Sequence, residues 1–217
     1  APEIVVTSLF GVFLNALSGT YAYVKQHRVY FKAAIPFAIA TLPGAILGSL
    51  VSDYFTGPTF SLSYGIFILI ISAIMYWNSS NKKAIATNFD ETLFIARKKL
   101  GIILSMFVGF ISSIFGIGGG IIHVPVMIYA LAFPPHMATA TSHFVLAVSS
   151  FMGVTSHIFL NHIVWIPALA VGFGAVIGAQ IGARLSKKTK PRSIILLLCI
   201  SLFLLGIRMI VESNLLF

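Results

Sequence analysis

The chain has 217 residues, of which 58% are hydrophobic and only 9% are charged, with a mean hydropathy of +1.00. Soluble domains carry about 25% charged residues, so this composition excludes an ordinary soluble protein and indicates an integral membrane protein. A net charge of +9 would suggest nucleic-acid binding in a soluble chain, but here the basic residues lie between apolar stretches. We therefore attribute this charge to orientation in a bilayer and predict no nucleic-acid partner.

Six apolar stretches are each long enough to cross a membrane as a helix of about 20 residues. They lie at 4–23, 33–52, 59–78, 139–160, 163–184 and 193–214. One sizeable polar stretch, 79–99, is predicted to be a cytoplasmic linker. It separates residues 1–78 from residues 100–217, and we assign both parts to a single transmembrane domain.

A further apolar segment, 100–133, is interrupted by glycines at 116 and 118–120 and then by Pro125. Each arm is short for a full crossing, so the segment is predicted to form a broken helix or a re-entrant hairpin. Irregular backbone at membrane depth is tolerated only where it is buried in protein or lines a cavity.

The glycine run Gly118, Gly119 and Gly120 is the sharpest candidate for a binding site. Glycine lets another group approach the backbone closely, and unpaired N–H groups ahead of a helix attract anions. We interpret the run as a cradle for a small anion within the membrane. The alternative is tight packing between helices, which also uses small residues.

The chain contains an internal repeat, because a shift of 134 positions (Thr141 minus Thr7) lays a first copy on a second without a gap. The matched pairs include Gly19 with Gly153, Gly44 with Gly178 and Gly48 with Gly182. Duplicated membrane segments are typical of secondary transporters. The same shift carries 100–133 to positions before Ala1. We therefore expect that the first repeat, 1–78, lacks its N-terminal part and that the polypeptide continues upstream.

The basic residues favour one topology. If segment 100–133 leaves the membrane on the side where it enters, or crosses twice, 13 of the 14 Lys and Arg residues share one face and only Arg208 lies elsewhere. The positive-inside rule makes that face cytoplasmic. Span 4–23 then runs toward the cytoplasm and its partner 139–160 runs away from it. The predicted fold is an all-α integral membrane protein of two inverted-topology repeats with a broken or re-entrant glycine-rich helix pair.

Polar side chains at matched positions of the two repeats are further candidates for substrate binding. They are Thr7, Ser8 and Asn15 in the first repeat and Thr141, Ser142 and Ser149 in the second. Their hydroxyl and amide groups could donate hydrogen bonds to an oxyanion. The alternative is that they cap a helix or bond to backbone within their own helix.

Two histidines, His123 and His143, lie in predicted membrane segments, where an ionisable group is a functional candidate. Because histidine titrates near neutral pH, either could carry a proton coupled to transport or place positive charge beside an anion. The alternative is an intramembrane metalloenzyme that uses the clustered histidines. The chain has no H-x-x-x-H or H-E-x-x-H pair, and we predict no metal and no cofactor.

Small residues recur along one face of the span 163–184, at Gly174, Gly178 and Gly182. We interpret this stripe as a helix-packing face. Gln180 in the same span needs a polar partner or a position in the cavity.

An ordered series of motifs carries a family resemblance. It runs GIGGGIIHVPVMIYALAFPPHMATATS, then Ser149-Ser150 and Gly153, then Gly178-Ala179 and Gly182-Ala183. In this order the motifs resemble the sulfite exporter TauE/SafE family of membrane permeases, strongly over 101–186 and more weakly over 7–52.

The resemblance implies a carrier in a bacterial or archaeal cytoplasmic membrane for small sulfur oxyanions or organosulfonates, such as sulfite and thiosulfate. We predict a secondary transporter, an exporter by this likeness and not an enzyme, that works by alternating access about a midplane anion site. Its predicted partners are a small anionic substrate and the lipid bilayer, while a coupling proton and a homo-oligomer stay open.

Overall fold

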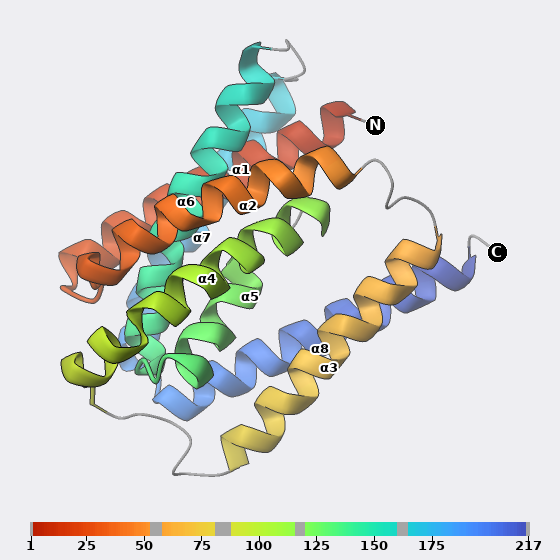
Figure 1. Ribbon diagram of the computed structural model, residues 1–217. Helices are drawn as coiled ribbons and strands as arrows, with labels where there is room; N and C mark the ends of the chain where they lie inside the picture. Colours follow the sequence, from red (N-terminus) through yellow and green to blue (C-terminus); the bar gives the residue numbers. More distant parts are fainter. Residues whose placement is uncertain (1, 53–57, 81–87, 116–119, 160–164, 216–217) are drawn as a thin grey trace.

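The computed structural model describes residues 2–52, 58–80, 88–115, 120–159 and 165–215, and these fold into helices without any strand (Figure 1). In chain order the elements are α1 Pro2–Lys25, α2 Phe31–Ser52, α3 Pro58–Ser80, α4 Glu91–Phe115, α5 Gly120–Pro125, the π-helix η2 Val126–Ala130, α6 Pro135–Phe159, α7 Trp165–Lys188 and α8 Pro191–Leu215. The predicted all-α class is therefore confirmed.

Four helices in the described residues are long and apolar enough to cross a membrane. Their candidate spans are Phe31–Gly48 in α2, Leu62–Ser79 in α3, Ala168–Lys188 in α7 and Pro191–Val211 in α8. The predicted span 4–23 falls within α1, and the predicted span 139–160 follows α6 as far as its end at Phe159. Both are long helices but are not among these four.

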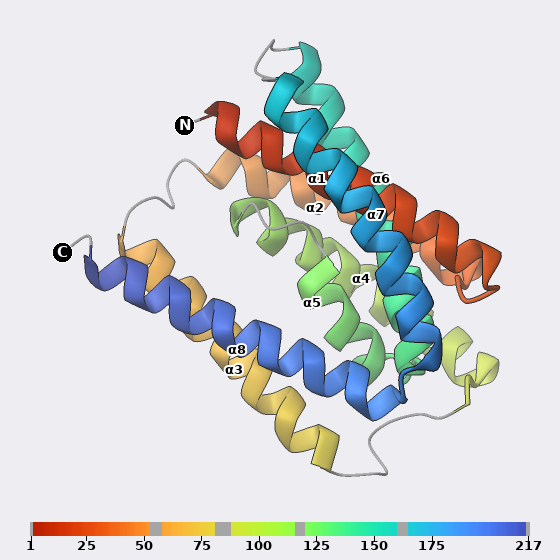
Figure 2. The ribbon, with the colours of Figure 1, turned by 180° about the vertical axis from the view of Figure 1, so that it is seen from behind.

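The helices form one bundle with a helical pair beside it (Figures 1 and 2). Within the bundle, α2 packs on α4, and α1 packs on both α6 and α7. The pair consists of α3 and α8, which run antiparallel. It meets the bundle where the Tyr129 hydroxyl of η2 donates to the carbonyl of Met75 on α3 (3.1 Å).

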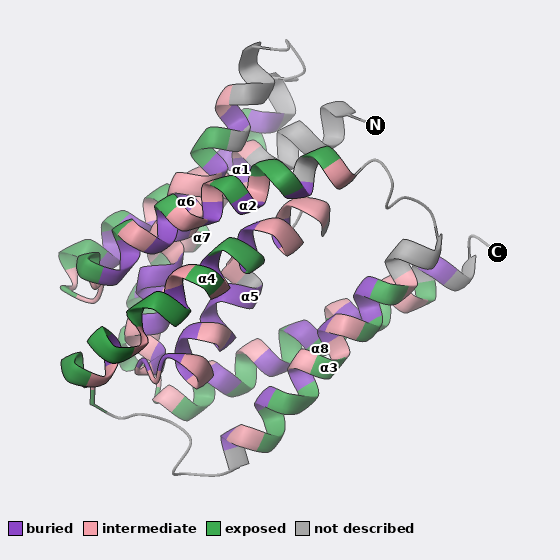
Figure 3. Cartoon of the chain, viewed as in Figure 1, coloured by how far each residue is buried: buried purple, intermediate pink, exposed green. Residues whose placement is uncertain are grey.

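Exposed residues recur along the outer sides of the helices, and many of them are large and apolar (Figure 3). Phe173 on α7 is 71% exposed and Trp77 on α3 is 82% exposed. Soluble monomers rarely expose contiguous apolar patches of more than a few hundred Å². Contact with lipid acyl chains satisfies such a surface, in agreement with the composition.

The contact between α2 and α4 is a backbone-to-backbone approach made by glycine. A Cβ added at Gly44 would collide with the carbonyl oxygen of Met106, and one added at Gly48 would collide with that of Phe110. Gly109 on α4 contributes in the same way, because its added Cβ would strike the carbonyl of Thr41. Small residues thus bring two membrane helices to close range, where dispersion contacts hold them.

The segment predicted to be a broken helix or a re-entrant hairpin contains α4 and α5, one on each side of residues that the structure does not describe. Helix α4 ends at Phe115 and α5 begins at Gly120, while 116–119 lie outside the described residues. The Arg97 guanidinium donates to the carbonyl of Ala130 (2.9 Å) near the start of α4, and Ser105 meets His123 further along. Helix α5 and η2 therefore run back antiparallel to α4 and form a hairpin with it.

Most of the described basic residues gather at the end of the bundle where this hairpin opens. Lys32 at the start of α2 forms an ion pair with Glu91 at the start of α4 (2.7 Å). Arg28 donates to the hydroxyl of Ser186, in the last turns of α7 (3.4 Å). Helix ends that are far apart in sequence are thus brought together, whereas the predicted orientation of this end toward the cytoplasm stays a prediction.

Candidate functional site

His123 lies inside the α4–α5 hairpin and is almost completely buried, at 1% exposure. Its Nε2 is 3.0 Å from the Ser105 hydroxyl oxygen, and its ring packs beside that of Phe37 on α2 (centroids 6.0 Å apart). The Ser105 hydroxyl donates its single hydrogen to the carbonyl of Gly101 (2.7 Å), so it can only accept from the imidazole. This assigns the hydrogen of the neutral ring to Nε2 and leaves a lone pair on Nδ1.

The Nδ1 atom of His123 has no hydrogen-bond partner among the described residues. A buried polar atom left unpaired costs about 1–3 kcal/mol. Such an atom is therefore a place where a ligand or a proton gains binding energy.

The break between α4 and α5 offers a second polar atom of this kind. Ser112, in the last turns of α4, is buried, and its hydroxyl likewise finds no partner in the described part of the chain. Gly120, the first residue of α5, faces α6, because a Cβ added there would lie 3.2 Å from the Leu146 side chain. The predicted cradle residues Gly118 and Gly119 lie outside the described residues.

The hydroxyl groups predicted on α6 are engaged in local hydrogen bonds. Thr141 is fully buried and accepts from the backbone N–H of Tyr30 (3.2 Å). Ser142 donates to the carbonyl of Thr139 (3.1 Å). Ser149 donates to the carbonyl of Leu146 (3.1 Å). For both serines, the structure shows the alternative of bonding within their own helix.

His143 lies against α1, whereas His123 lies against α2 and α4. The Nδ1 atom of His143 is 3.2 Å from the carbonyl oxygen of Thr139. The His143 ring meets the Tyr23 ring edge-on, with the ring centroids 5.3 Å apart. The ring also packs on Gly19, where an added Cβ would be 2.8 Å from Cδ2. The two candidate histidines thus contact different helices and different side chains.

Among the first-repeat candidates, only Asn15 has a side chain that the structure describes, and it does not contact the matched candidates on α6. Asn15 donates from Nδ2 to the carbonyl of Ala175 on α7 (3.3 Å) rather than to a group on α6. The side chains of Thr7 and Ser8 lie outside the described residues. Their role as ligands stays a prediction.

A ladder of polar contacts joins α1 to α7, and sequence reasoning identified only one of its members as a residue in need of a partner. Gln180 donates to the backbone carbonyl of Ser18 (2.8 Å) and to its hydroxyl (2.9 Å). The Ser18 hydroxyl donates to the carbonyl of Val176 (3.0 Å), and Gln26 donates to that of Ala183 (3.2 Å). Asn15 and Ser18 share one face of α1, Gln26 follows the end of the helix in the same register, and that spacing was the available signal.

The metalloenzyme alternative has no ligand set in the part of the chain that the structure describes. No three His, Cys, Asp or Glu side chains there are grouped closely enough to hold a metal ion.

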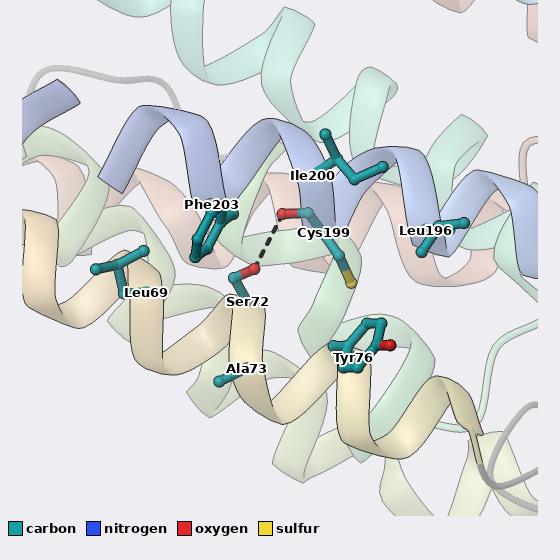
Figure 4. A pocket seen from close by; sticks show the side chains of 8 residues that line it. All are labelled: Leu69, Ser72, Ala73, Tyr76, Leu196, Cys199, Ile200 and Phe203. Atoms are coloured by element: carbon teal, nitrogen blue, oxygen red, sulfur yellow. Dashed lines mark hydrogen bonds between the residues drawn. The ribbon is translucent and has the colours of Figure 1, made fainter. Parts of the chain in front are cut away.

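A separate groove of about 460 Å³ lies between α3 and α8 (Figure 4). Its lining is almost wholly apolar and consists of Leu69, Ser72, Ala73, Tyr76, Leu196, Cys199, Ile200 and Phe203. The Ser72 hydroxyl points across to α8 and donates to the carbonyl of Cys199 (2.9 Å), so it is already satisfied. This groove has the chemistry of an acyl-chain contact and offers nothing to an anion.

The described residues contain four candidate membrane spans and, inside the bundle, a helical hairpin with buried polar groups. The similarities of the chain place it in the class of membrane transporters. Residues 1–209 match the sequence profile described as sulfite exporter TauE/SafE, so the chain belongs to that family, as its motifs predict. It is 34% identical to the probable membrane transporter protein YunE of Bacillus subtilis, over 98% of this chain and 82% of that protein.

Two further relatives agree with this classification. A probable membrane transporter protein of Methanocaldococcus jannaschii is 28% identical over 94% of this chain and 77% of its own length. Another, from Xylella fastidiosa, is 27% identical over 86% of this chain and 71% of its own length. No solved structure matches the chain. The chain is thus a membrane transporter, a class that is distinct from enzymes.

Proposed function

We propose that the protein carries small sulfur-containing anions, such as sulfite, thiosulfate or organosulfonates, across a cell membrane. The observation that carries this proposal is the α4–α5 hairpin, in which Gly120 faces α6 inside the bundle and two buried polar atoms, Ser112 Oγ and His123 Nδ1, find no partner among the described residues. The sulfur chemistry comes from the description of the family. Glycine backbone N–H groups and the Ser112 hydroxyl would donate to the oxyanion.

His123 gives the site a means to adjust its charge. A proton taken up on Nδ1 would make the ring a cation beside the bound anion, with Nε2 still held by Ser105. An anion and a proton would then enter together, which provides a coupling route in a carrier. The basic end of the bundle would raise the local concentration of anions at one face, and the positive-inside rule makes that face cytoplasmic.

Alternating access between two inverted repeats is the mechanism that we propose. Its support is the shift of 134 positions (Thr141 minus Thr7) together with the packing of α1 against α6, which the shift makes equivalent. Phe13 meets Phe151 and Tyr23 meets His143, so these two helices pass each other antiparallel. Helix α1 packs on α7, and α2 packs on α6. Each group of helices that moves as a rigid unit during alternating access would therefore contain helices from both repeats.

The test is solute flux in proteoliposomes that contain the purified protein. Labelled sulfite, thiosulfate and a small organosulfonate are offered at equal concentration, with lactate and potassium as competing solutes. We expect saturable uptake of at least one sulfur anion and none of lactate or potassium. Uptake of lactate or cations without any sulfur anion would refute the proposal.

A further inference from the structure

The groove between α3 and α8 follows the helical pair and opens to the outside of the molecule (Figure 4). Its lining includes Tyr76, Ile200 and Phe203, which are 61%, 48% and 51% exposed. On α3 the lining extends from Leu69 to Tyr76, a rise of about 10 Å at 1.5 Å per residue. In a bilayer, such a groove faces the acyl chains of lipids.

The chemistry of the lining suits an apolar chain. The Ser72 hydroxyl is already satisfied by the carbonyl of Cys199, and the rest of the lining is mainly hydrocarbon. A polar solute would give up its hydrogen bonds to water here and gain few in return. An acyl chain has no such bonds to lose, so it fits the groove.

Helix α8 carries a basic residue in line with the groove. Leu196, Ile200 and Phe203 recur at spacings of four and three residues, so they lie on one face of α8. Arg192 is four residues before Leu196, on the same face, and is exposed in the first turn of the helix. No described carboxylate forms an ion pair with Arg192. The groove therefore continues at one end toward a cation that an anionic group can approach.

Trp77 indicates the depth of this end in the membrane. Because α3 and α8 are antiparallel, Trp77 near the end of α3 and Arg192 at the start of α8 lie at the same end of the pair. Trp77 is 82% exposed, and tryptophan is enriched where the hydrocarbon meets the headgroups. The groove thus runs from the interface into the hydrocarbon, as an acyl chain does below its headgroup. The positive-inside rule predicts that this end faces the cytoplasmic leaflet, which carries anionic lipids.

We propose that the α3–α8 groove and Arg192 together bind an anionic phospholipid, with one acyl chain in the groove and the headgroup phosphate at the guanidinium. Guanidinium groups bind phosphate through paired, charge-assisted hydrogen bonds. The proposal does not depend on which solute the transporter carries.

The preference for an anionic lipid comes from charge and not from the groove. Acyl chains have apolar surroundings everywhere in the bilayer, so the groove itself favours no particular headgroup. A zwitterionic lipid brings an ammonium group close to Arg192 together with its phosphate, and the like charges weaken the attraction. A lipid with a net negative charge lacks this repulsion.

An open face of α7 provides the comparison. Gly174, Gly178 and Gly182 are predicted to form a packing face, but a Cβ added at any of them meets no described atom within 4 Å, so the structure leaves this face open. None of the three lines the groove. Arg184 is exposed two residues after Gly182, so it is a basic residue of the same kind that lies outside the α3–α8 pair.

Native mass spectrometry of the purified protein measures how tightly the first lipid binds. Phosphatidylglycerol and phosphatidylcholine with identical acyl chains are titrated separately. We expect phosphatidylglycerol to bind about fivefold more tightly, the factor that one basic residue near a membrane surface contributes. Arg192→Gln should make the two affinities equal, Arg192→Lys should keep most of the difference, and Arg184→Gln should leave it unchanged. Equal affinities in the wild type, or a preference that survives Arg192→Gln, would overturn the proposal.

A second pair of variants tests the groove. Ala73→Phe places a ring in the groove and should lower the affinity for both lipids about tenfold. Ile74→Phe adds a ring one residue along α3, at an exposed position outside the lining, and should change neither affinity by more than about twofold. Equal effects of the two variants would place the acyl chain elsewhere and refute the proposal.

Photolabelling then locates the lipid in the full-length protein. Phosphatidylglycerol with a diazirine on its acyl chain should label peptides of α3 and α8 more strongly than those of α7, and inorganic phosphate at equal concentration should not compete. Label spread evenly over the three helices, displacement by inorganic phosphate, or a groove occupied by a second copy of the chain would overturn the proposal. No solute flux is measured, so failure of the transport proposal and failure of this one remain distinguishable.

Discussion

The α4–α5 hairpin and the α3–α8 pair are both apolar and helical, but they differ in how they treat buried polar atoms. In the hairpin, Ser112 Oγ and His123 Nδ1 have no partner among the described residues. In the pair, the Ser72 hydroxyl bonds to the carbonyl of Cys199 beside a groove of about 460 Å³. The comparison teaches that a large cavity does not indicate an anion site, whereas unpaired polar atoms do, because they gain most from a polar ligand.

The largest effect is expected from crowding the break. In Gly120→Leu the new side chain would press on Leu146, and overpacking of about 1–3 kcal/mol should lower anion flux by up to about 100-fold. Ala73→Leu likewise introduces a leucine, in the α3–α8 groove, and should leave flux within about twofold. Flux in proteoliposomes at matched protein density measures both. Equal losses of flux in the two variants would contradict the assignment of the anion site to the α4–α5 hairpin rather than to the α3–α8 groove.

Loss of the buried imidazole should have the next largest effect. His123→Leu removes a hydrogen bond that would become charge-assisted when an anion is bound, a contribution of about 1.5–3 kcal/mol, so flux should fall about tenfold or more. The pH dependence of flux should flatten in the same variant if His123 carries the coupled proton. Cys199→Ser, on the α3–α8 side, should keep the wild-type profile. An unaltered pH profile in His123→Leu would exclude this residue as the proton carrier.

Removal of a single hydroxyl should lower anion affinity in the α4–α5 hairpin but lower thermal stability in the α3–α8 pair. Ser112→Ala should reduce anion affinity about fivefold, since a hydrogen bond contributes about 1 kcal/mol, with little change in thermal stability. Ser72→Ala removes a bond inside the protein and should lower Tm while affinity stays the same. Binding titrations and thermal unfolding in detergent provide the two readouts. A Ser112→Ala protein that lost stability but kept its affinity would assign that hydroxyl a structural role.

The smallest effect is expected at the basic end. The hydrogen bond from Lys32, followed by that from Tyr30, lowers the pKa of the Glu91 carboxyl below its ordinary value. Because the folded pKa is the lower one, the contact stabilises the protein above the ordinary pKa and is lost as the pH falls through the folded value. Glu91→Gln should therefore decrease Tm slightly at pH 7, and the difference should vanish in acid. The pair is exposed, so a large decrease would contradict this assignment.

Much of the fold could be predicted from the lengths of the apolar stretches. The predicted span 33–52 coincides closely with α2, and α4 and α5 lie one on each side of residues 116–119, where the break is predicted. Helix α7 continues to Lys188, beyond the predicted end at 184, because long basic side chains can keep their charges in water while their stems stay apolar.

The details of the site could not be predicted, for a physical reason. A serine in a membrane helix has the same sequence signature whether it donates to a substrate or to its own backbone, and Ser142 and Ser149 take the second course. Likewise, Gly44 and Gly178 are alike in sequence but differ in whether a helix covers them. Such distinctions depend on neighbours that are distant in the chain.

The most direct test of the central claim is equilibrium binding of labelled sulfite to the purified protein and to its Gly120→Leu and Ala73→Leu variants. An anion site at the break between α4 and α5 predicts saturable binding that Gly120→Leu abolishes and Ala73→Leu preserves. Binding that persists unchanged in Gly120→Leu would contradict the account.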